Sequence, residues 1–166
     1  SYTDQFGLSG GLVSAVDLLK GLARCAGLEV IEVEGATGEL NTNYVGKARA
    51  ALDVLEERDF VLVHVEAPDE AGHMKDLEAK LEAIERFDER VVGTVLDGVD
   101  EESTRVLITP DHYTPYTLGV HTGEPVPFAA LKAGERDEVK EYGERSCAKG
   151  SLGTVMGYEM MRILMG

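Results

Sequence analysis

The sequence has only two cysteines, no tryptophan, few basic residues and no long hydrophobic run. Cys25 and Cys147 are too few for a disulfide framework and lack the Cys-x-x-Cys spacing of zinc and redox sites, so we expect them to be small, partly buried side chains in a reducing cytoplasm. With 16 Lys and Arg against 31 Asp and Glu, the formal charge of −15 makes nucleic acid and anionic membranes poor partners. No apolar run approaches the roughly 18 residues that span a membrane.

The length and the hydrophobic content of the chain predict a globular protein. The chain has 166 residues with a hydrophobic fraction of 43%, which suits one domain that buries roughly two-thirds of its unfolded surface. An acidic protein that acts on anionic substrates needs local positive charge, and bound divalent cations would supply it. The chain begins at Ser1 without an initiator methionine, so we expect that its N-terminus has been cut away.

Helical and strand patterns alternate along the chain, which predicts an α/β fold with a mainly parallel sheet and helices on both faces. In such sheets, ligands bind beyond the carboxyl ends of the strands. Residues 1–10 and 133–151 show no regular pattern. Asn43 and Asp76 are the expected caps of the second and third helices. The predicted helices cover residues 12–26, 43–57, 76–99 and 154–165, and the predicted strands cover 28–33, 60–65, 105–109 and, at a sheet edge, 125–131.

A carboxylate and an imidazole follow the predicted strand over residues 60–65. Pro68 ends the strand because it has no amide hydrogen for the ladder, and Asp69 and His73 come next, four residues apart. The alternative is that Asp69 caps a turn and that His73, like the later His121, is an ordinary surface polar residue. The charged positions of the following helix, among them Lys80 and Arg86, are most simply explained as a solvated face.

The predicted strand over residues 105–109 ends in the same way, at Asp111 and His112, and His121 follows in HTGEPVP. Two strands that each end in a carboxylate and an imidazole predict one metal site at one sheet edge. Asp111 and His112 could ligate a metal, or one of them could orient the other. The alternative is a turn aspartate that bonds its own backbone.

The donor types indicate which metals suit the site. Asp69, His73 and His121 offer one carboxylate and two imidazoles. That set suits Mn²⁺, Zn²⁺ or Fe²⁺ better than Mg²⁺ or Ca²⁺, which prefer shells of oxygen alone.

No nucleophile is convincing in this chain. Ser14 falls in a predicted helix, Ser103 in an acidic turn, and Ser146 and Ser151 in a late loop, and none has a companion base at a readable spacing. His64, in the middle of an apolar strand, is expected to be a core histidine or to support a ligand. Nothing marks a substrate clamp among the cations on helix faces, which are Lys20, Arg24, Lys47 and Arg49.

The motifs HVEAPDEAGH, ITPDH and HTGEPVPF, in this order, resemble those of the cofactor-independent phosphoglycerate mutases of the alkaline phosphatase superfamily, particularly the archaeal-type branch. The segments SAVDLLKGLARCAGLEV, EGATGELNTNY and KGSLG extend the resemblance through most of the chain. The ordered trio is specific, whereas any one motif alone would be weak.

The resemblance implies a three-layer α/β/α sandwich of the alkaline phosphatase type with a binuclear metal site. By motif position, Asp69, His73 and His121 would hold one metal, and Asp111 and His112 would belong to the other. The implied cofactors are two divalent ions, Mn²⁺ first with Zn²⁺, Co²⁺ and Mg²⁺ as alternatives, and no 2,3-bisphosphoglycerate. The family reaction interconverts 3-phosphoglycerate and 2-phosphoglycerate through a phosphoserine, with the metals polarising the phosphate.

The chain departs from the family pattern because the N-terminal half, with its nucleophilic serine, early aspartate and lid, is not present. Residues 1–166 are therefore expected to form a single partial domain, the C-terminal portion, with little or no mutase activity of its own. Its incomplete sheet predicts exposed apolar surface and self-association. The alternatives are another phosphotransferase or hydrolase of the superfamily and a non-catalytic metal-binding or interaction domain.

Overall fold

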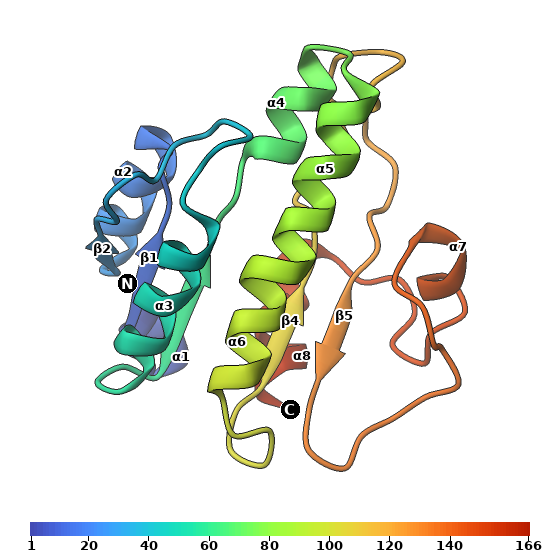
Figure 1. Ribbon diagram of the computed structural model, residues 1–166. Helices are drawn as coiled ribbons and strands as arrows, with labels where there is room; N and C mark the ends of the chain where they lie inside the picture. Colours follow the sequence, from blue (N-terminus) through green and yellow to red (C-terminus); the bar gives the residue numbers. More distant parts are fainter. The chain divides into compact units, whose positions relative to one another are not determined.

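The computed structural model describes residues 1–166, which form two compact units (Figure 1). The first unit comprises residues 1–99 and 115–120, and the second unit comprises residues 100–114 and 121–166. That these residues make a single partial domain stays a prediction. None of the helices combines the length and the apolar character needed to cross a membrane.

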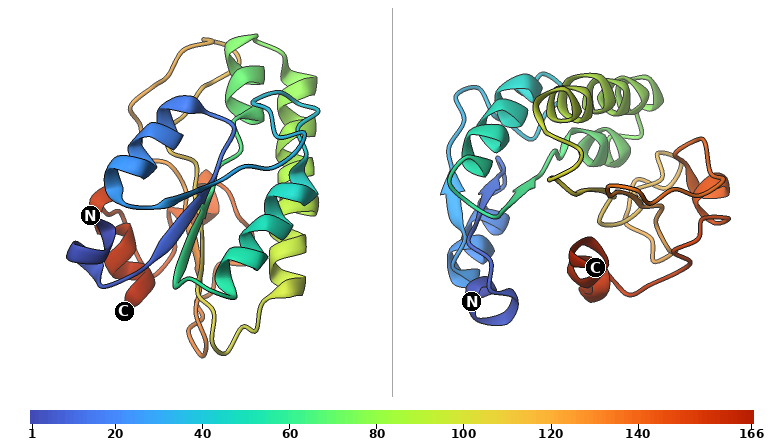
Figure 2. Two further views of the ribbon diagram at one scale, coloured as in Figure 1. Left: turned by 90° about the vertical axis from the view of Figure 1, so that its left-hand side faces the viewer. Right: turned by 90° about the horizontal axis from the view of Figure 1, so that it is seen from below.

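The first unit contains a parallel three-stranded sheet, which confirms the predicted α/β class. Strands β1 (Gly10–Val13), β2 (Glu29–Ile31) and β3 (Phe60–Val63) pair in the order β2-β1-β3. Helix α2 (Asp17–Ala26) joins β1 to β2, and α3 (Tyr44–Leu55) lies between β2 and β3 in the chain. Since parallel crossovers are right-handed and the two outer strands lie on opposite sides of β1, α2 and α3 cover opposite faces of the sheet (Figure 2).

The predicted helix over residues 12–26 is wrong in its first turn, because residues 10–13 form the fully buried central strand β1. The strand approaches its neighbours closely at two glycines. A Cβ on Gly10 would lie 2.9 Å from Cδ1 of Phe60, and one on Gly11 would lie 3.1 Å from Cγ1 of Val54. Residues 1–10, predicted to be irregular, contain the short helix α1 (Tyr2–Phe6).

The long helix predicted over residues 76–99 is confirmed as a continuous run of three helical segments. These are α5 (Leu77–Phe87), the π-helical turn η1 (Asp88–Val92) and α6 (Gly93–Gly98). Asp76 caps the run as predicted, with its Oδ1 accepting from the amide of Ala79 at 2.9 Å. The shorter helix α4 (Ala67–His73) precedes it.

Two buried clusters hold the first unit together. One lies between α2 and the sheet and consists of Leu12, Ala23 and Leu28. The other joins α3, α4, α5 and η1 through Tyr44, Ala48, Ala67, Ala83 and Val91. The second cluster matters for function because Ala67 anchors the start of α4, the helix that follows β3.

The second unit has a smaller sheet. Strand β4 (Val106–Ile108) pairs antiparallel with β5 (Ala129–Leu131), which confirms the two predicted strands in shortened form. A short helix α7 (Glu144–Cys147) lies in the region predicted to be irregular. The predicted terminal helix is confirmed only in part, as the 3₁₀ turn η2 (Gly157–Glu159) and α8 (Met160–Met165).

Strands β3 and β4 belong to different sheets, so the prediction that both motifs follow strands of one sheet is wrong. The sequence shows that each strand is short and apolar, but it does not show which strands pair. In the structure β4 finds its hydrogen-bonding partner in β5 at the register Leu107 to Ala130.

Candidate metal centre

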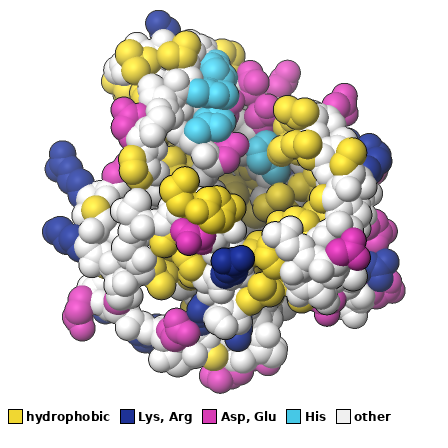
Figure 3. Space-filling view, turned by 180° about the vertical axis from the view of Figure 1, so that it is seen from behind, with side chains coloured by type: hydrophobic (Ala, Val, Ile, Leu, Met, Phe, Trp, Pro, Cys, Tyr) yellow, Lys and Arg dark blue, Asp and Glu magenta, His cyan; other side chains and the backbone are white.

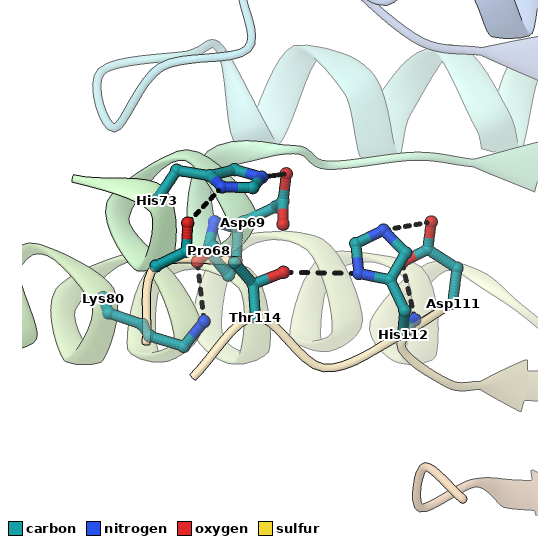
Figure 4. A network of polar contacts seen from close by, with 8 residues as sticks. Pro68, Asp69, His73, Lys80, Asp111, His112 and Thr114 are labelled. Atoms are coloured by element: carbon teal, nitrogen blue, oxygen red, sulfur yellow. Dashed lines mark hydrogen bonds and ion pairs between the residues drawn. The ribbon is translucent and has the colours of Figure 1, made fainter. Parts of the chain in front are cut away.

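Helix α4 places Asp69 and His73 one turn apart on one face. The chain leaves β3 at Val63, and the carbonyl of Glu66 then accepts from the amides of Asp69 and Glu70 at 2.8 and 3.1 Å. The resulting helical turn brings Nε2 of His73 to 3.3 Å from Oδ2 of Asp69 (Figure 4). The two predicted residues are therefore in contact, and the side chains of His73 and Asp69 are 37% and 25% exposed.

The other nitrogen of His73 fixes the protonation pattern of the ring. Nδ1 lies 3.0 Å from the carbonyl oxygen of Gly119, which can only accept, so Nδ1 carries the hydrogen. In a neutral ring, the lone pair of Nε2 then faces the carboxylate of Asp69. A nitrogen and a carboxylate oxygen 3.3 Å apart, with the other ring nitrogen held by a backbone carbonyl, form an arrangement typical of metal ligands.

Gly119 can make this contact because of its backbone conformation. Its φ is +71°, and its amide donates to the carbonyl of Pro115 at 2.8 Å. A Cβ at this position would lie 2.7 Å from Cε of Lys75 and 3.2 Å from the carbonyl oxygen of His73. Only glycine fits there without strain, so the segment that orients His73 depends on Gly119.

Three carboxylates gather at the start of α4. Glu66, Asp69 and Glu70 each offer an oxygen, and these oxygens lie within 4.8 Å of one another. Glu66 and Glu70 were not predicted as site residues, although their spacing of four residues around Asp69 is a helical signal that indicates a shared face. The oxygens of these three carboxylates fit a divalent metal, and Asp69 adds the neighbouring imidazole nitrogen of His73 at 3.3 Å.

Two cations predicted to lie on a solvated helix face make specific contacts instead. Nζ of Lys80 donates to the carbonyl of Pro68 at 2.9 Å, inside the first turn of α4 (Figure 4). Burial lowers the pKa of Lys80, and the nearby Asp69 carboxylate partly opposes that shift. Arg86 donates to the carbonyl of Leu40 at 2.9 Å. The solvated-face prediction is therefore wrong for Lys80 and Arg86.

The second unit brings Asp111, His112 and His121 together. Nε2 of His112 lies 3.4 Å from Oδ2 of Asp111, and its Nδ1 lies 3.3 Å from Oγ1 of Thr114 (Figure 4). The rings of His112 and His121 stack with centroids 3.7 Å apart, next to a bridge in which the amide of Thr122 donates to the carbonyl of Tyr113. Oδ1 of Asp111 also accepts from the amide of His112 at 3.1 Å, as the turn alternative proposed.

His64 and Ser14 meet at the carboxyl ends of β3 and β1. Oγ of Ser14 lies 3.3 Å from Nδ1 of His64 and accepts from the amide of Val16 at 3.1 Å. Ser14 is 3% exposed, and it follows the central strand rather than lying in a helix, so its predicted placement is wrong. His64 therefore belongs to a polar cluster inside the first unit.

Lys47 is a buried residue that the sequence analysis did not single out. Its side chain is fully buried, and Nζ donates to the carbonyls of Thr37 and His64 at 3.2 and 3.4 Å. Burial lowers its pKa to about 8, and the Glu66 carboxylate partly opposes this shift. The signal was present in the sequence, since Lys47 shares a helix face with Tyr44 at i−3.

Comparison with known proteins identifies related chains. The model of the metalloenzyme superfamily matches residues 1–166. A relative from Methanothrix thermoacetophila, named a 2,3-bisphosphoglycerate-independent phosphoglycerate mutase, is 50% identical over 98% of this chain. Only 42% of that relative is covered, so the chain spans less than half the length of such relatives.

Two solved structures share the fold. A protein from Pyrococcus horikoshii superimposes with a TM-score of 0.95 at 42% identity, over 99% of this chain and 50% of that one. The cofactor-independent phosphoglycerate mutase from Thermoplasma acidophilum superimposes with a TM-score of 0.72 at 29% identity, over 99% of this chain and 38% of that one.

Proposed function

The chain belongs to the metalloenzyme superfamily, and we propose that it is the metal-binding, C-terminal part of a 2,3-bisphosphoglycerate-independent phosphoglycerate mutase. The observation that carries this proposal is the pair formed by Asp69 and His73. With Nδ1 of His73 bonded to Gly119, Nε2 is the nitrogen that lies beside the Asp69 carboxylate, and an imidazole next to a carboxylate is a donor pair that divalent metals bind. Its relatives carry the mutase name.

Divalent ions bound by this chain would polarise the phosphate of the substrate and offset its negative charge. Asp69 would supply a negatively charged oxygen ligand, and His73 would supply a ring nitrogen whose orientation is fixed by the bond to Gly119. Asp111 and His112 would supply a second pair. We propose two ions, with Mn²⁺ as the expected metal and Zn²⁺, Co²⁺ or Mg²⁺ as alternatives.

The grouping of Asp69 and His73 with His121 around one ion stays a prediction. Titration of an His121→Ala variant with Mn²⁺ tests it. Loss of one bound ion per chain supports the grouping, and unchanged binding contradicts it.

In the complete protein, we propose interconversion of 3-phosphoglycerate and 2-phosphoglycerate in the cytoplasm. The serine nucleophile of this reaction is not expected from residues 1–166. Ser14 is buried, and its Oγ accepts a hydrogen bond from the amide of Val16, which makes it a poor nucleophile. We therefore expect little or no mutase activity from this chain alone.

Self-association is part of the proposal. Leu18 and Leu22 on α2 are 71% and 56% exposed, and Leu81 and Ile84 on α5 are about half exposed. Hydrophobic side chains also reach the surface on the face that Figure 3 shows. Such exposure favours contact with another protein surface, including a second copy of the chain.

The test is a mutase assay on the complete protein that contains this chain. We expect turnover of 3-phosphoglycerate that is abolished by EDTA, restored by Mn²⁺, and absent in the Asp69→Ala variant. Turnover that survives removal of all metal would contradict the proposal. No turnover of phosphoglycerate, with hydrolysis of another phosphate ester, would favour a different enzyme of the superfamily.

A further inference from the structure

A buried polar cluster lies at the carboxyl end of β3, next to the start of α4. Lys47 is at its centre, because Nζ bonds the carbonyl of His64, the residue after β3, and the carbonyl of Thr37 in the loop before α3. The side chain of Ser14 joins through the ring of His64. All of these residues belong to the first unit.

A buried lysine lowers the stability of the fold, because its charge loses its contact with water. Lys47 is fully buried beside the apolar side chains of Ala48 and Ala51 on α3, where a methionine would fill similar space without a charge. Replacement of buried charges by apolar side chains is often neutral or stabilising. Burial lowers the pKa of Lys47 only to about 8, because the Glu66 carboxylate opposes the effect of burial. Most of the amine is therefore protonated at neutral pH.

The carboxylate that opposes the effect of burial on Lys47 belongs to Glu66, at the start of α4. Glu66 is the N-cap residue of α4 and its carbonyl accepts from the amides of Asp69 and Glu70, yet its side chain makes no capping hydrogen bond. The loop approaches Glu66 from the other side, since a Cβ on Gly38 would lie 2.7 Å from its Oε2. The loop before α3 therefore lies against the N-cap residue of this short helix.

We propose that Lys47 is a positioning residue for the metal-binding motif. Its buried ammonium, bonded to the carbonyls of Thr37 and His64 and balanced by Glu66, fixes the start of α4 against the end of β3 and so fixes the direction in which Asp69 is presented. This inference rests on the proposed function, because it assigns Lys47 to the support of the metal site.

The experiment measures Mn²⁺ affinity by calorimetry for the wild-type chain, Lys47→Met and a matched control, Lys20→Met. Lys20 also belongs to the first unit and pairs with Glu32 at 2.7 Å, away from α4. For Lys47→Met we expect binding weakened by about tenfold, the size typical of losing support behind a metal ligand. Lys20→Met is expected to bind as the wild type does.

A second readout separates positioning from a general loss of stability. The absorption spectrum of bound Co²⁺ reports coordination geometry, and we expect it to change in folded Lys47→Met but not in Lys20→Met. A Gly38→Ala variant provides an independent test, because its Cβ would displace the flexible end of Glu66 without disturbing buried backbone. It is expected to weaken Mn²⁺ binding several-fold with an unchanged thermal midpoint.

Each outcome decides the inference. If the wild-type chain binds no Mn²⁺, the proposed metal site fails and this role of Lys47 fails with it. If the wild type binds and folded Lys47→Met binds equally well with the same Co²⁺ spectrum, only the role of Lys47 is overturned. If Lys47→Met does not fold, Gly38→Ala decides, and wild-type affinity in that variant overturns the role.

Discussion

The two units hold their candidate metal ligands in different ways. In the first unit, Asp69 and His73 lie on a helix anchored by Ala67 and Ala71, each 1% exposed. All of the buried hydrophobic side chains belong to this unit, whereas in the second unit Thr114 is the one buried side chain. The first pair is thus preorganised by a packed core, and the second set depends on local hydrogen bonds and ring stacking.

The largest expected contrast comes from shortening one leucine in each sheet. Leu12→Ala, in the buried strand β1, is expected to destabilise by about 3 kcal/mol, because it removes packed methyl groups and leaves a cavity. Leu107→Ala, in half-buried β4, is expected to cost about 1 kcal/mol. Urea unfolding followed by residue-resolved hydrogen exchange measures both. Equal losses would contradict the contrast between the units.

Metal should reduce the difference between the units. At a free Mn²⁺ concentration of about 100 times Kd, binding stabilises the folded state by about 2.7 kcal/mol. We expect hydrogen exchange to slow more at Thr122, whose amide bonds Tyr113 beside the stacked histidines, than at Leu12 in the core of the first unit. EDTA should reverse this effect. Slower exchange at Leu12 alone would show that metal binding does not stabilise the second unit.

The buried charge of Lys47 should give the first unit a pH dependence of its own. The pKa is about 8 in the folded chain and about 10.4 when unfolded. Between these values the unfolded chain holds a proton that the folded chain has released, so stability rises with pH in this window. Relative to Lys47→Met, the wild type should gain about 2 kcal/mol between pH 8 and 10.

Chemical unfolding of the wild type and Lys47→Met at several pH values measures this gain. The comparison with Lys47→Met cancels the titration of other groups, including Tyr44, whose raised pKa has the opposite effect above pH 10. A stability difference that stays constant across the window would mean that the folded and unfolded chains share one lysine pKa.

The smallest contrast concerns helix caps. Oδ1 of Asn43 accepts from the amide of Gly46 at the start of α3, so Asn43→Ala should cost about 1 kcal/mol. In the second unit, the N-cap residue of α7 is Gly143, which has no side chain to cap the helix and has open space at its Cβ position. Gly143→Ala should change stability by less than about 0.5 kcal/mol. Thermal unfolding of both variants measures the difference, and equal shifts would contradict it.

Local signals predicted the fold where they were strong. Asn43 and Asp76 cap helices as expected. Pro68 does not end the strand, because β3 stops at Val63 and Pro68 lies in the first turn of α4. The prediction failed at residues 10–13 because Leu12 and Val16 match helical spacing and the two glycines resemble a turn. Only long-range packing against Phe60 and Val54 explains glycines inside a strand.

The candidate site was predictable to a similar degree. The spacing of Asp69 and His73 indicated their pairing, and the spacing around Asp111 indicated a second set. The sequence could not show that Gly119 orients His73 from 46 residues away, since that contact depends on a turn with positive φ. The position of Lys47 three residues after Tyr44 placed it toward the inward face of its helix, but only the structure shows that its side chain is fully buried.

The most direct test of the central claim is a calorimetric Mn²⁺ titration of the wild-type chain beside Asp69→Ala, His73→Ala and the control Glu57→Ala. Glu57 is an exposed carboxylate of the same unit that lies after α3. We predict saturable binding in the wild type and the control, lost in both Asp69→Ala and His73→Ala while the variants stay folded. Wild-type affinity in either of those variants would contradict the assignment of this pair as metal ligands.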